Sequence, residues 1–380
     1  MKILHTSDWH LGRILHGHSL VEDQQHVLEQ ILVELEKNYD VLIVAGDVFD
    51  RAVAPAPAMT LLNDFLNKVR ALEISVVMIP GNHDSMERLN YGAALFEQHD
   101  IHIRCSYDQL KPVAVKNAAG DECDIFTMPF VEHHRVGEIL NDETVLDKES
   151  AIKALLTKMK KYRRSAVPSI LVAHEFIDHA EESESERVFV GGSHLVNASL
   201  FNDFSYVALG HLHKAQEAGL KHIHYCGTPL AYSFGEVENS QGVLSVSISG
   251  SGVAVEPVLI SPFRPMVVLE GAFETLVNDS EYDRFTGHYV SARITDEGHH
   301  LNLQARLRER FPHLLETRLM AVEKRIESGA EMTGSGSDNP MEVFDAFLKF
   351  FQWSEEEERE EAVRLFEQAS EATRQKEAVQ

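Results

Sequence analysis

The sequence predicts an α/β fold in which a sheet of buried, largely parallel strands is flanked by helices. Short apolar runs rich in Val and Ile alternate with helical patterns in the first part of the chain, and each run ends in a polar cluster. Such runs are typical of buried strands, and strand–helix–strand alternation implies parallel pairing. Because ligands bind beyond the carboxyl ends of parallel strands, clusters that are distant in sequence could meet at one edge of the sheet.

The expected elements follow in chain order. Helices are expected near Ser19–Lys37 and Ala56–Leu72, and antiparallel strands between about His222 and Val258. The runs that we expect to form strands are Ile3–His5, Val41–Ala45, Val76–Ile79, Ile170–Ala173 and Tyr206–Leu209.

A change of pattern after residues 261–265, which read as a hinge, predicts further domains. A small α/β domain is expected, with strands near Met266–Leu269, Tyr289–Ile294 and Arg318–Val322 and a helix near Leu301–Phe311. A flexible linker and a helical tail with an aromatic stripe follow. The predicted boundaries are 1–262, 263–326, 327–340 and 341–380.

The composition is that of an enzyme-sized globular chain with a strongly acidic balance. The 380 residues include 60 acidic and 35 basic side chains, which gives a formal net charge of −25. This charge excludes a simple basic nucleic-acid-binding protein. It does not exclude a metal enzyme that acts on phosphates, because bound cations invert the charge of a site locally.

Cysteine usage and the apolar runs predict a cytoplasmic protein. The three cysteines, Cys105, Cys123 and Cys226, are far apart and form no CxxC pair, which fits a reducing cytosol. The chain becomes polar soon after Met1, so no signal peptide is expected. No apolar run reaches the ~18 residues of a membrane span.

Five polar clusters at predicted strand ends together indicate a dinuclear metal site. They supply carboxylate, amide and imidazole ligands: Asp8-x-His10, Gly46-Asp47-Val48-Phe49-Asp50, Gly81-Asn82-His83-Asp84, His174 and Gly210-His211-Leu212-His213. Each cluster alone has an ordinary structural explanation, such as a helix N-cap, a Gly-Asn turn or a core histidine. The order of the clusters and their common position are the stronger signal.

Residue types within the clusters suit particular roles. Asp8 and His10 are two residues apart on a strand end, so their side chains share a face. Asp47 directly follows a buried strand and could bridge two metals, while His83 could donate a proton. Two divalent cations would outweigh the charges of Asp8 and Asp47 and attract a phosphodiester, and a two-metal site could activate water and clamp the phosphate.

The order of the clusters resembles the calcineurin-like metallophosphoesterase superfamily. The runs Thr6–Gly12, Gly46–Asp50 and Pro80–Ser85 are similar, more narrowly, to the nuclease subunits of the bacterial SbcCD complexes, and this likeness extends at motif level from Met1 to about Phe263. It implies a four-layer α/β/β/α sandwich with a small α/β capping domain for DNA recognition and a helical C-terminal tail.

The resemblance also implies a role for each site residue. Asp8, His10, Asp47 and His213 would hold one metal, and Asp47, Asn82, His174 and His211 the other. His83 would be the general acid or would stabilise the transition state, oriented by Asp84. Manganese, two ions per subunit, is the family's usual metal; the ligand types alone also admit Mg²⁺, Fe or Zn²⁺.

The implied activity is that of a 3′-to-5′ exonuclease on duplex DNA and an endonuclease on single strands and hairpins, in DNA repair, recombination and replication. The implied partner is the SbcC ATPase, in a heterotetramer with two copies of each chain, onto which the tail would dock. Helices at Asn63–Val69 and Leu89–Phe96 would form a homodimer face. A metallophosphatase of the same superfamily and a non-catalytic scaffold for an ATPase are the alternatives.

One departure from the family concerns Asp50 and Arg51. Archaeal and eukaryotic relatives carry a histidine in place of Asp50, and phosphoprotein phosphatases of the superfamily keep a phosphate-binding arginine at the position of Arg51. Arg51 could therefore contact a DNA phosphate or make a surface salt bridge. His16 and His18, which follow the first cluster closely, could line the site.

Overall fold

The computed structural model describes residues 1–178, 180–181, 195–250, 252–297, 302–327, 344, 362–366 and 368. The chain divides into two compact units, Met1–Pro265 and Met266–Gln380. The predicted linker, apart from its first residue, and most of the predicted helical tail lie outside the described residues. Among the described helices, none combines the length and the apolar character needed to cross a membrane.

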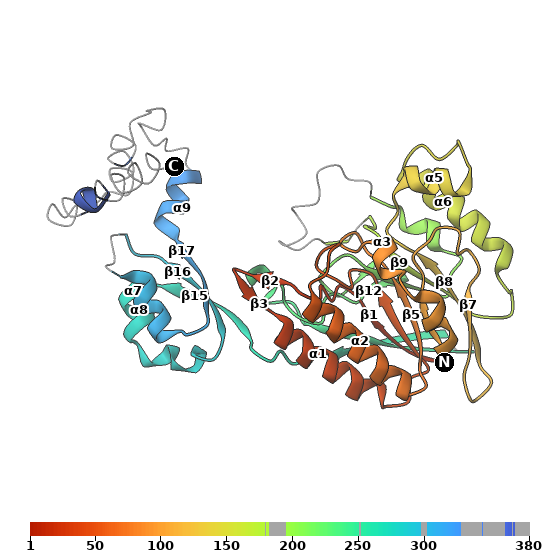
Figure 1. The fold of residues 1–380 in the computed structure, drawn as a ribbon, viewed down its shortest axis with the longest axis horizontal. Coiled ribbons are helices and arrows are strands. Elements are labelled where there is room, and N and C mark those ends of the chain that lie inside the picture. The colour runs from red at the N-terminus through yellow and green to blue at the C-terminus, as the bar shows by residue number, and fades with distance from the viewer. Residues whose placement is uncertain are drawn as a thin grey trace, which may run out of the picture. The chain divides into compact units, whose positions relative to one another are not determined.

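Two six-stranded sheets form the framework of the first unit (Figure 1). The first sheet has the order β14 (Gly252–Leu259), β13 (Gly242–Ser249), β1 (Lys2–Thr6), β4 (Val41–Ala45), β5 (Ser75–Ile79), β6 (Ile101–Ile103). The second has the order β11 (Gln216–Ala218), β12 (Leu220–Tyr225), β10 (Tyr206–Gly210), β9 (Ser169–His174), β8 (Glu122–Met128), β7 (Val113–Lys116). The central strands of both are parallel. Antiparallel strands adjoin them on the β1 side of the first sheet and at both edges of the second, whereas β6 pairs parallel with β5.

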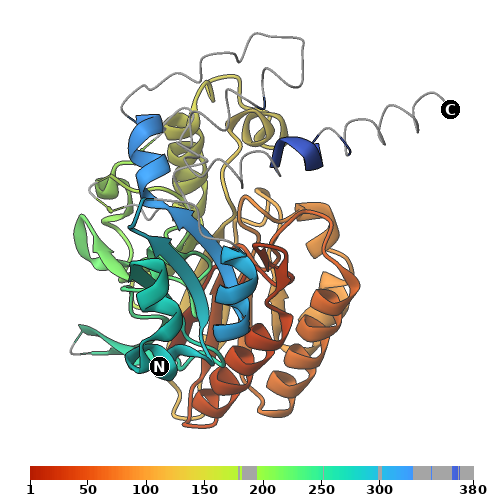
Figure 2. The ribbon, with the colours of Figure 1, turned by 90° about the vertical axis from the view of Figure 1, so that its left-hand side faces the viewer.

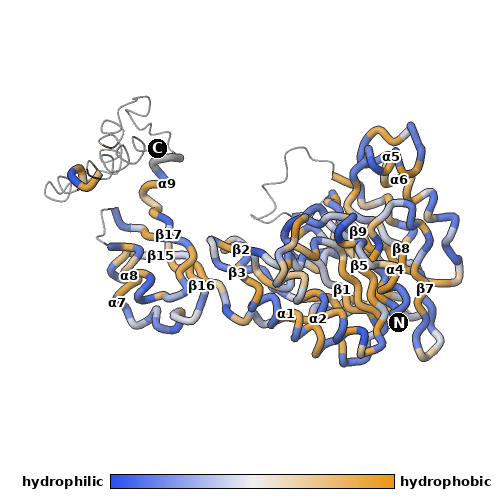
Figure 3. The backbone as a smooth tube through the Cα atoms, viewed as in Figure 1, coloured by the Kyte–Doolittle hydropathy of each residue, from blue (hydrophilic) through white to orange (hydrophobic). Residues whose placement is uncertain are grey.

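The two sheets pack face to face through one apolar core. Its members alternate along the strands, and include Ile3, Val41, Ile43 and Val77 of the first sheet and Ile125, Ile170, Val172 and Ala208 of the second. The central strands are also buried on their other faces, so they read as continuous apolar runs (Figure 3). Full burial of one such Val or Ile side chain contributes roughly 1.5–3 kcal/mol.

Helices form the two outer layers of this unit. Helices α1 (Val21–Leu35) and α2 (Ala56–Ala71) lie side by side against the first sheet (Figure 2). Helices α5 (His133–Leu140) and α6 (Lys148–Met159) pack on the second through Val136, Ile152 and Leu155. The arrangement is an α/β/β/α sandwich, which confirms the predicted fold class.

Short elements connect these layers. They include β2 (Ile14–Leu15), β3 (His18–Ser19), α3 (Met86–Leu89), α4 (Ala93–Phe96) and the 3₁₀ turns η1 (Glu97–His99), η2 (Lys160–Tyr162), η4 (Ala198–Phe201) and η5 (Phe234–Glu236). The segment Leu89–Phe96, expected to be one helix of a dimer face, is instead the end of α3 and the whole of α4. Gly92 separates them with a left-handed backbone, φ 78°.

The second unit holds a three-stranded parallel sheet in the order β15, β16, β17. Its elements are β15 (Met266–Gly271), α7 (Phe273–Asn278), η6 (Ser280–Phe285), β16 (Tyr289–Ile294), α8 (Leu303–Arg310), β17 (Leu314–Leu319) and α9 (Met320–Glu327). The prediction of a strand near Arg318–Val322 was wrong in position. Pairing with β16 ends at Leu319, and the apolar residues that follow belong to α9. A short apolar run does not by itself distinguish the end of a strand from the first turn of a helix.

A histidine lies within the core between the two sheets. The His5 side chain is fully buried, and its Nδ1 lies 3.0 Å from the hydroxyl oxygen of Tyr206. Burial, with a smaller effect of the His224 charge, lowers the pKa of His5 to about 3. The unfolded chain, with an ordinary histidine pKa near 6.5, therefore binds more protons than the folded chain between about pH 6.5 and pH 3. Stability is lost as the pH falls through this window.

We expect replacement of His5 by Gln to remove part of the acid sensitivity of the fold. Between about pH 7.5 and 5.5 the wild-type chain should lose about 1.4 kcal/mol more unfolding free energy than His5→Gln, one pKa unit of protonation being worth that amount. Equilibrium urea unfolding at both pH values measures the difference. Equal losses in the two proteins would contradict this account of His5.

Candidate metal centre

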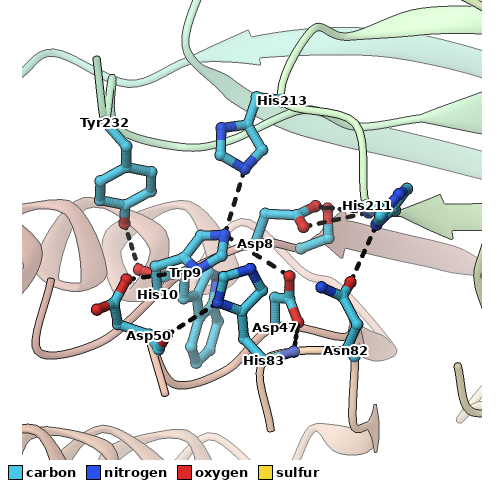
Figure 4. A network of polar contacts seen from close by, with 12 residues as sticks. Asp8, Trp9, His10, Asp47, Asp50, Asn82, His83, His211, His213 and Tyr232 are labelled. Atoms are coloured by element: carbon cyan, nitrogen blue, oxygen red, sulfur yellow. Dashed lines mark hydrogen bonds and ion pairs between the residues drawn. The ribbon is translucent and has the colours of Figure 1, made fainter. Parts of the chain in front are cut away.

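The five polar clusters meet at one edge of the first unit, where strands of both sheets end. Asp8 and His10 follow β1, Asp47 follows β4, and Asn82 follows β5. His174 is the last residue of β9, and His211 and His213 follow β10. Figure 4 shows the side chains from these loops converging, with His10 and His213 directed at one another and Asp47 beside them. The structure thus brings together all the side chains that the sequence predicts as ligands.

The backbone at this edge is strained. Asp8, His10, Asp47 and His211 have φ angles of 53°, 43°, 48° and 105°, which L-residues rarely adopt. Each such residue costs on the order of 1–3 kcal/mol and persists only where its surroundings enforce it. Here the N–H of Asp8 donates to the carbonyl of Gly46 and that of His10 to the carbonyl of Asp47, each at 3.0 Å. Strain that is concentrated in this way is typical of a functional site.

Glycines allow the loops to approach so closely. A Cβ atom on Gly210 would lie 2.0 Å from the carbonyl oxygen of Ala45 and 2.8 Å from Nδ1 of His174. One on Gly81 would lie 2.2 Å from Oδ1 of Asp47. The glycines of the sequence clusters are therefore required by space.

The candidate ligand atoms form two overlapping groups around Asp47. On one side, Nε2 of His10 lies 3.2 Å from Nε2 of His213 and 3.7 Å from Oδ2 of Asp47. On the other side, the same Asp47 oxygen lies 3.4 Å from Nε2 of His174. Asn82 completes this second side: its Oδ1 lies 3.1 Å from Nε2 of His174 and 3.0 Å from Nδ1 of His211.

The charges of the buried carboxyl and imidazole groups in the site depend on one another. Burial raises the pKa of the Asp8 carboxyl to about 7, and the Asp47 charge adds to the rise. Burial would also raise the pKa of Asp47, but His174 and His10 hold it well below its usual range. Burial opposes a charge on His174, yet Asp47 raises the pKa of this imidazole to about 9. A divalent cation beside Asp8 and Asp47 would favour the charged form of both carboxyls.

The donor set fits such cations. Carboxylate and amide oxygens with imidazole nitrogens suit manganese, iron, zinc or magnesium. Among the described residues, three groups of His and acidic side chains have ligand atoms within 4.8 Å of one another, namely Asp8–His10–His213, Asp8–Asp47–His174 and His10–Asp50–His83. The first two groups share Asp8, and the second includes Asp47 itself.

Further contacts orient the imidazoles. Nδ1 of His174 donates to the carbonyl of Ala45 at 2.8 Å, and Nδ1 of His213 lies 3.0 Å from Oε1 of Glu236. Each contact turns Nε2 of its ring toward the centre and fixes the tautomer. Glu236 is fully buried and also accepts from the N–H of Tyr232. Sequence reasoning missed Glu236 because it lies in the turn η5, away from any strand end.

Asp84 acts differently from the sequence expectation, in which it orients His83. Its carboxylate accepts hydrogen bonds from the backbone N–H groups of Val48, Phe49 and Gly81, at 2.9–3.0 Å. Nδ1 of His83 instead donates to the backbone carbonyl of Asp50 at 2.9 Å. Asp84 therefore ties the loop after β5 to the loop after β4, and its effect on His83 is indirect.

Arg51 and the early histidines lie further out. The Arg51 side chain is 59% exposed, and its Nη2 lies 3.6 Å from Oδ2 of Asp50. Arg13, which the sequence did not single out, makes the shorter pair, with Nη1 at 2.8 Å from Oδ1 of Asp50. His16 is exposed and packs near the ring of Phe234. Among the described residues, neither His16 nor His18 belongs to a group of metal-ligand atoms.

Comparison with known proteins places the chain among phosphoesterases. Residues 1–215 match the family model described as calcineurin-like phosphoesterase, and residues 262–350 match the Type 5 capsule protein repressor C-terminal domain. The chain is 32% identical to the D subunit of the SbcCD nuclease of Staphylococcus saprophyticus over 83% of its length and 84% of the relative's. The same values describe its similarity to the protein of that name from Staphylococcus epidermidis.

Solved structures give weaker likenesses. TT1561 of Thermus thermophilus has a TM-score of 0.40 at 13% identity, over 67% of this chain and 98% of that one. GAP50, the anchor in the inner membrane complex of Plasmodium, has a TM-score of 0.43 at 14% identity, over 68% of this chain and 84% of that one. Likenesses at this level carry no argument about function.

We expect Gly210→Ala to weaken metal binding by at least about tenfold, because the added methyl group would displace the Ala45 carbonyl or the His174 ring, and ligand support is worth roughly 10–100-fold in affinity. Gly250→Ala is the matched control, since no described atom beyond its chain neighbours lies within 4 Å of its Cβ position. Calorimetric titration of metal-free protein with Mn²⁺ measures both. Unchanged binding by Gly210→Ala would contradict the placement of the ligands.

Glu236→Gln is expected to lower the affinity of the site on the His10–His213 side. The substitution keeps the volume but removes the charge that polarises His213, and comparable changes cost roughly 10–100-fold in metal affinity. Titration should show one weakened Mn²⁺ site and one unchanged. Two unchanged sites would mean that Glu236 serves only the fold of η5.

Proposed function

The chain belongs to the calcineurin-like phosphoesterase family and, within it, to the family of SbcD nuclease subunits, and we propose that it hydrolyses the phosphodiester bonds of DNA at a centre of two divalent cations. The observation that carries the proposal is the Asp47 carboxylate, which faces His10 on one side and His174 on the other. A single carboxylate with imidazoles on both sides suits a bridging ligand between two ions.

Asp47 is the shared ligand in this proposal, and the two sides of the centre differ in their other ligands. Asp8, His10 and His213 would complete one metal site, and Asn82, His174 and His211 the other. Mn²⁺ is the proposed ion, two per subunit, with Mg²⁺ as the alternative. Two bound cations would polarise the phosphate and lower the pKa of the attacking water.

The side chains around the metals would position the phosphate and move the proton. His83 is half-buried, and its Nδ1 is committed to the carbonyl of Asp50. Its Nε2 is therefore the nitrogen that would donate a proton to the leaving oxygen or stabilise the transition state. Asp84 supports this indirectly, through the loop that carries His83.

The finer activity follows from the family. We propose 3′-to-5′ exonuclease action on duplex DNA and endonuclease action on single strands and hairpins, in the cytoplasm, during DNA repair, recombination and replication. The SbcC ATPase would be the partner, in an assembly with two copies of each chain. Residues 263–326 would cap the DNA, and the tail from residue 341 would dock on the ATPase. A partner that carries basic DNA-binding surface would suit a chain with a net charge of −25.

The substitution His83→Ala tests the centre directly. General acid catalysis typically contributes about 10²–10⁴-fold, so the variant should lose that much Mn²⁺-dependent cutting of an end-labelled hairpin duplex while it still binds metal. The assay is run with and without SbcC and ATP. His99→Ala, at an exposed position in η1, is the matched control.

Three other results would each contradict a different part of the proposal. Equal cutting by wild type and His83→Ala would mean that His83 is not the proton donor. No DNA cutting by the wild type, together with hydrolysis of phosphomonoesters, would favour a metallophosphatase. A chain that binds no metal would favour the scaffold.

A further inference from the structure

Two arginines share one carboxylate beside the proposed metal centre. Oδ1 of Asp50 lies 2.8 Å from Nη1 of Arg13, and Oδ2 lies 3.6 Å from Nη2 of Arg51. One negative charge thus faces two positive charges, and the cluster keeps a net positive charge in a strongly acidic chain.

The same aspartate contacts the metal centre. Its backbone carbonyl accepts the hydrogen bond from Nδ1 of His83, and its Oδ1 lies 3.9 Å from Nδ1 of His10. This oxygen therefore lies between the guanidinium of Arg13 and a proposed metal ligand. The backbone N–H of Arg13 also donates to the carbonyl of His10 at 3.0 Å. The cationic cluster therefore lies directly beside the proposed metal centre.

Arg13 is fixed before any substrate binds. Its side chain is 29% exposed, and Asp50 holds one end of its planar group. Its Nε–H is buried and makes no hydrogen bond within the described part of the chain. An arginine oriented in this way loses little entropy when it binds an anion, and a guanidinium donates charged hydrogen bonds to phosphate oxygens. Arg51, which is more exposed, would form the outer side of the same subsite.

We propose that Arg13 and Arg51, held by Asp50, form an anion subsite that binds the phosphate next to the one being cut. The inference rests on the proposed function and deepens it, because it names the substrate feature that the site selects: consecutive phosphates of a nucleic-acid strand. An isolated phosphodiester would fill the metal centre and leave the subsite empty. A charged hydrogen bond of this kind is worth about 10- to 100-fold in binding.

The experiment uses a series of oligonucleotides that the protein cuts in the presence of Mn²⁺. In each one, a single phosphate near the cleavage site is replaced by a neutral methylphosphonate linkage, and the replaced position differs across the series. For the wild type, neutralising the linkage next to the cut should lower kcat/KM by about 10- to 100-fold, mainly through KM. Arg13→Gln should show a similar loss on the unmodified strand and little further loss with the neutral linkage. Arg51→Gln should show the same pattern with a smaller loss.

Two controls separate binding from structure. Arg70→Gln removes an exposed arginine from the end of α2 and should behave as the wild type. The manganese content of every variant shows whether the centre is intact. Because the wild type is tested on both the unmodified and the modified oligonucleotides, the neutral linkage reports on the subsite even if Arg13→Gln folds poorly.

The outcomes that overturn the inference are specific. A wild type that tolerates a neutral linkage at every position next to the cut has no such subsite. An active Arg13→Gln that remains as sensitive as the wild type shows that the arginine supports the loop only. A wild type that cuts no unmodified strand refutes the proposed function, and this inference with it.

Discussion

The position of the Asp47 carboxylate is the constraint on which the rest of the centre depends. Its Oδ2 faces the imidazoles of His10 and His174, and its Oδ1 accepts the backbone N–H of His83. The main chain of Asp47 also accepts from His10. One residue therefore sets the spacing of both sides of the centre and the start of the loop that carries the proposed acid. To occupy this position Asp47 adopts a left-handed backbone, which costs conformational energy, and the glycine before it is left-handed as well.

The fold and the meeting of the candidate ligands at one edge could be predicted because both have short-range signals in the sequence. Buried parallel strands are continuous apolar runs, and the ligands stand within a few residues of the strand ends, so the clusters could be located without knowledge of the loops. The same logic failed at β17, where the apolar run extends past the last strand pairing at Leu319 into α9.

Contacts between loops could not be predicted in this way. Glu236 reaches His213 from a turn, and Asp84 binds backbone groups of the preceding loop rather than the neighbouring imidazole. The Arg13–Asp50 pair joins segments on either side of α1. Each depends on how loops pack in three dimensions, and a common residue type such as Glu or Arg carries no positional signal for it.

The location of the candidate ligands at strand ends also bears on how such a chain can change in length. Ladder hydrogen bonds fix the ends of β1, β4, β5, β9 and β10, whereas the connections between them run over the surface. Insertions and deletions between the clusters would leave the ligands in place. Insertions or deletions within a cluster would move a carboxylate or imidazole away from the centre, because the backbone there is strained and closely packed. The spacing between clusters is therefore free to drift, while the spacing inside each cluster is not.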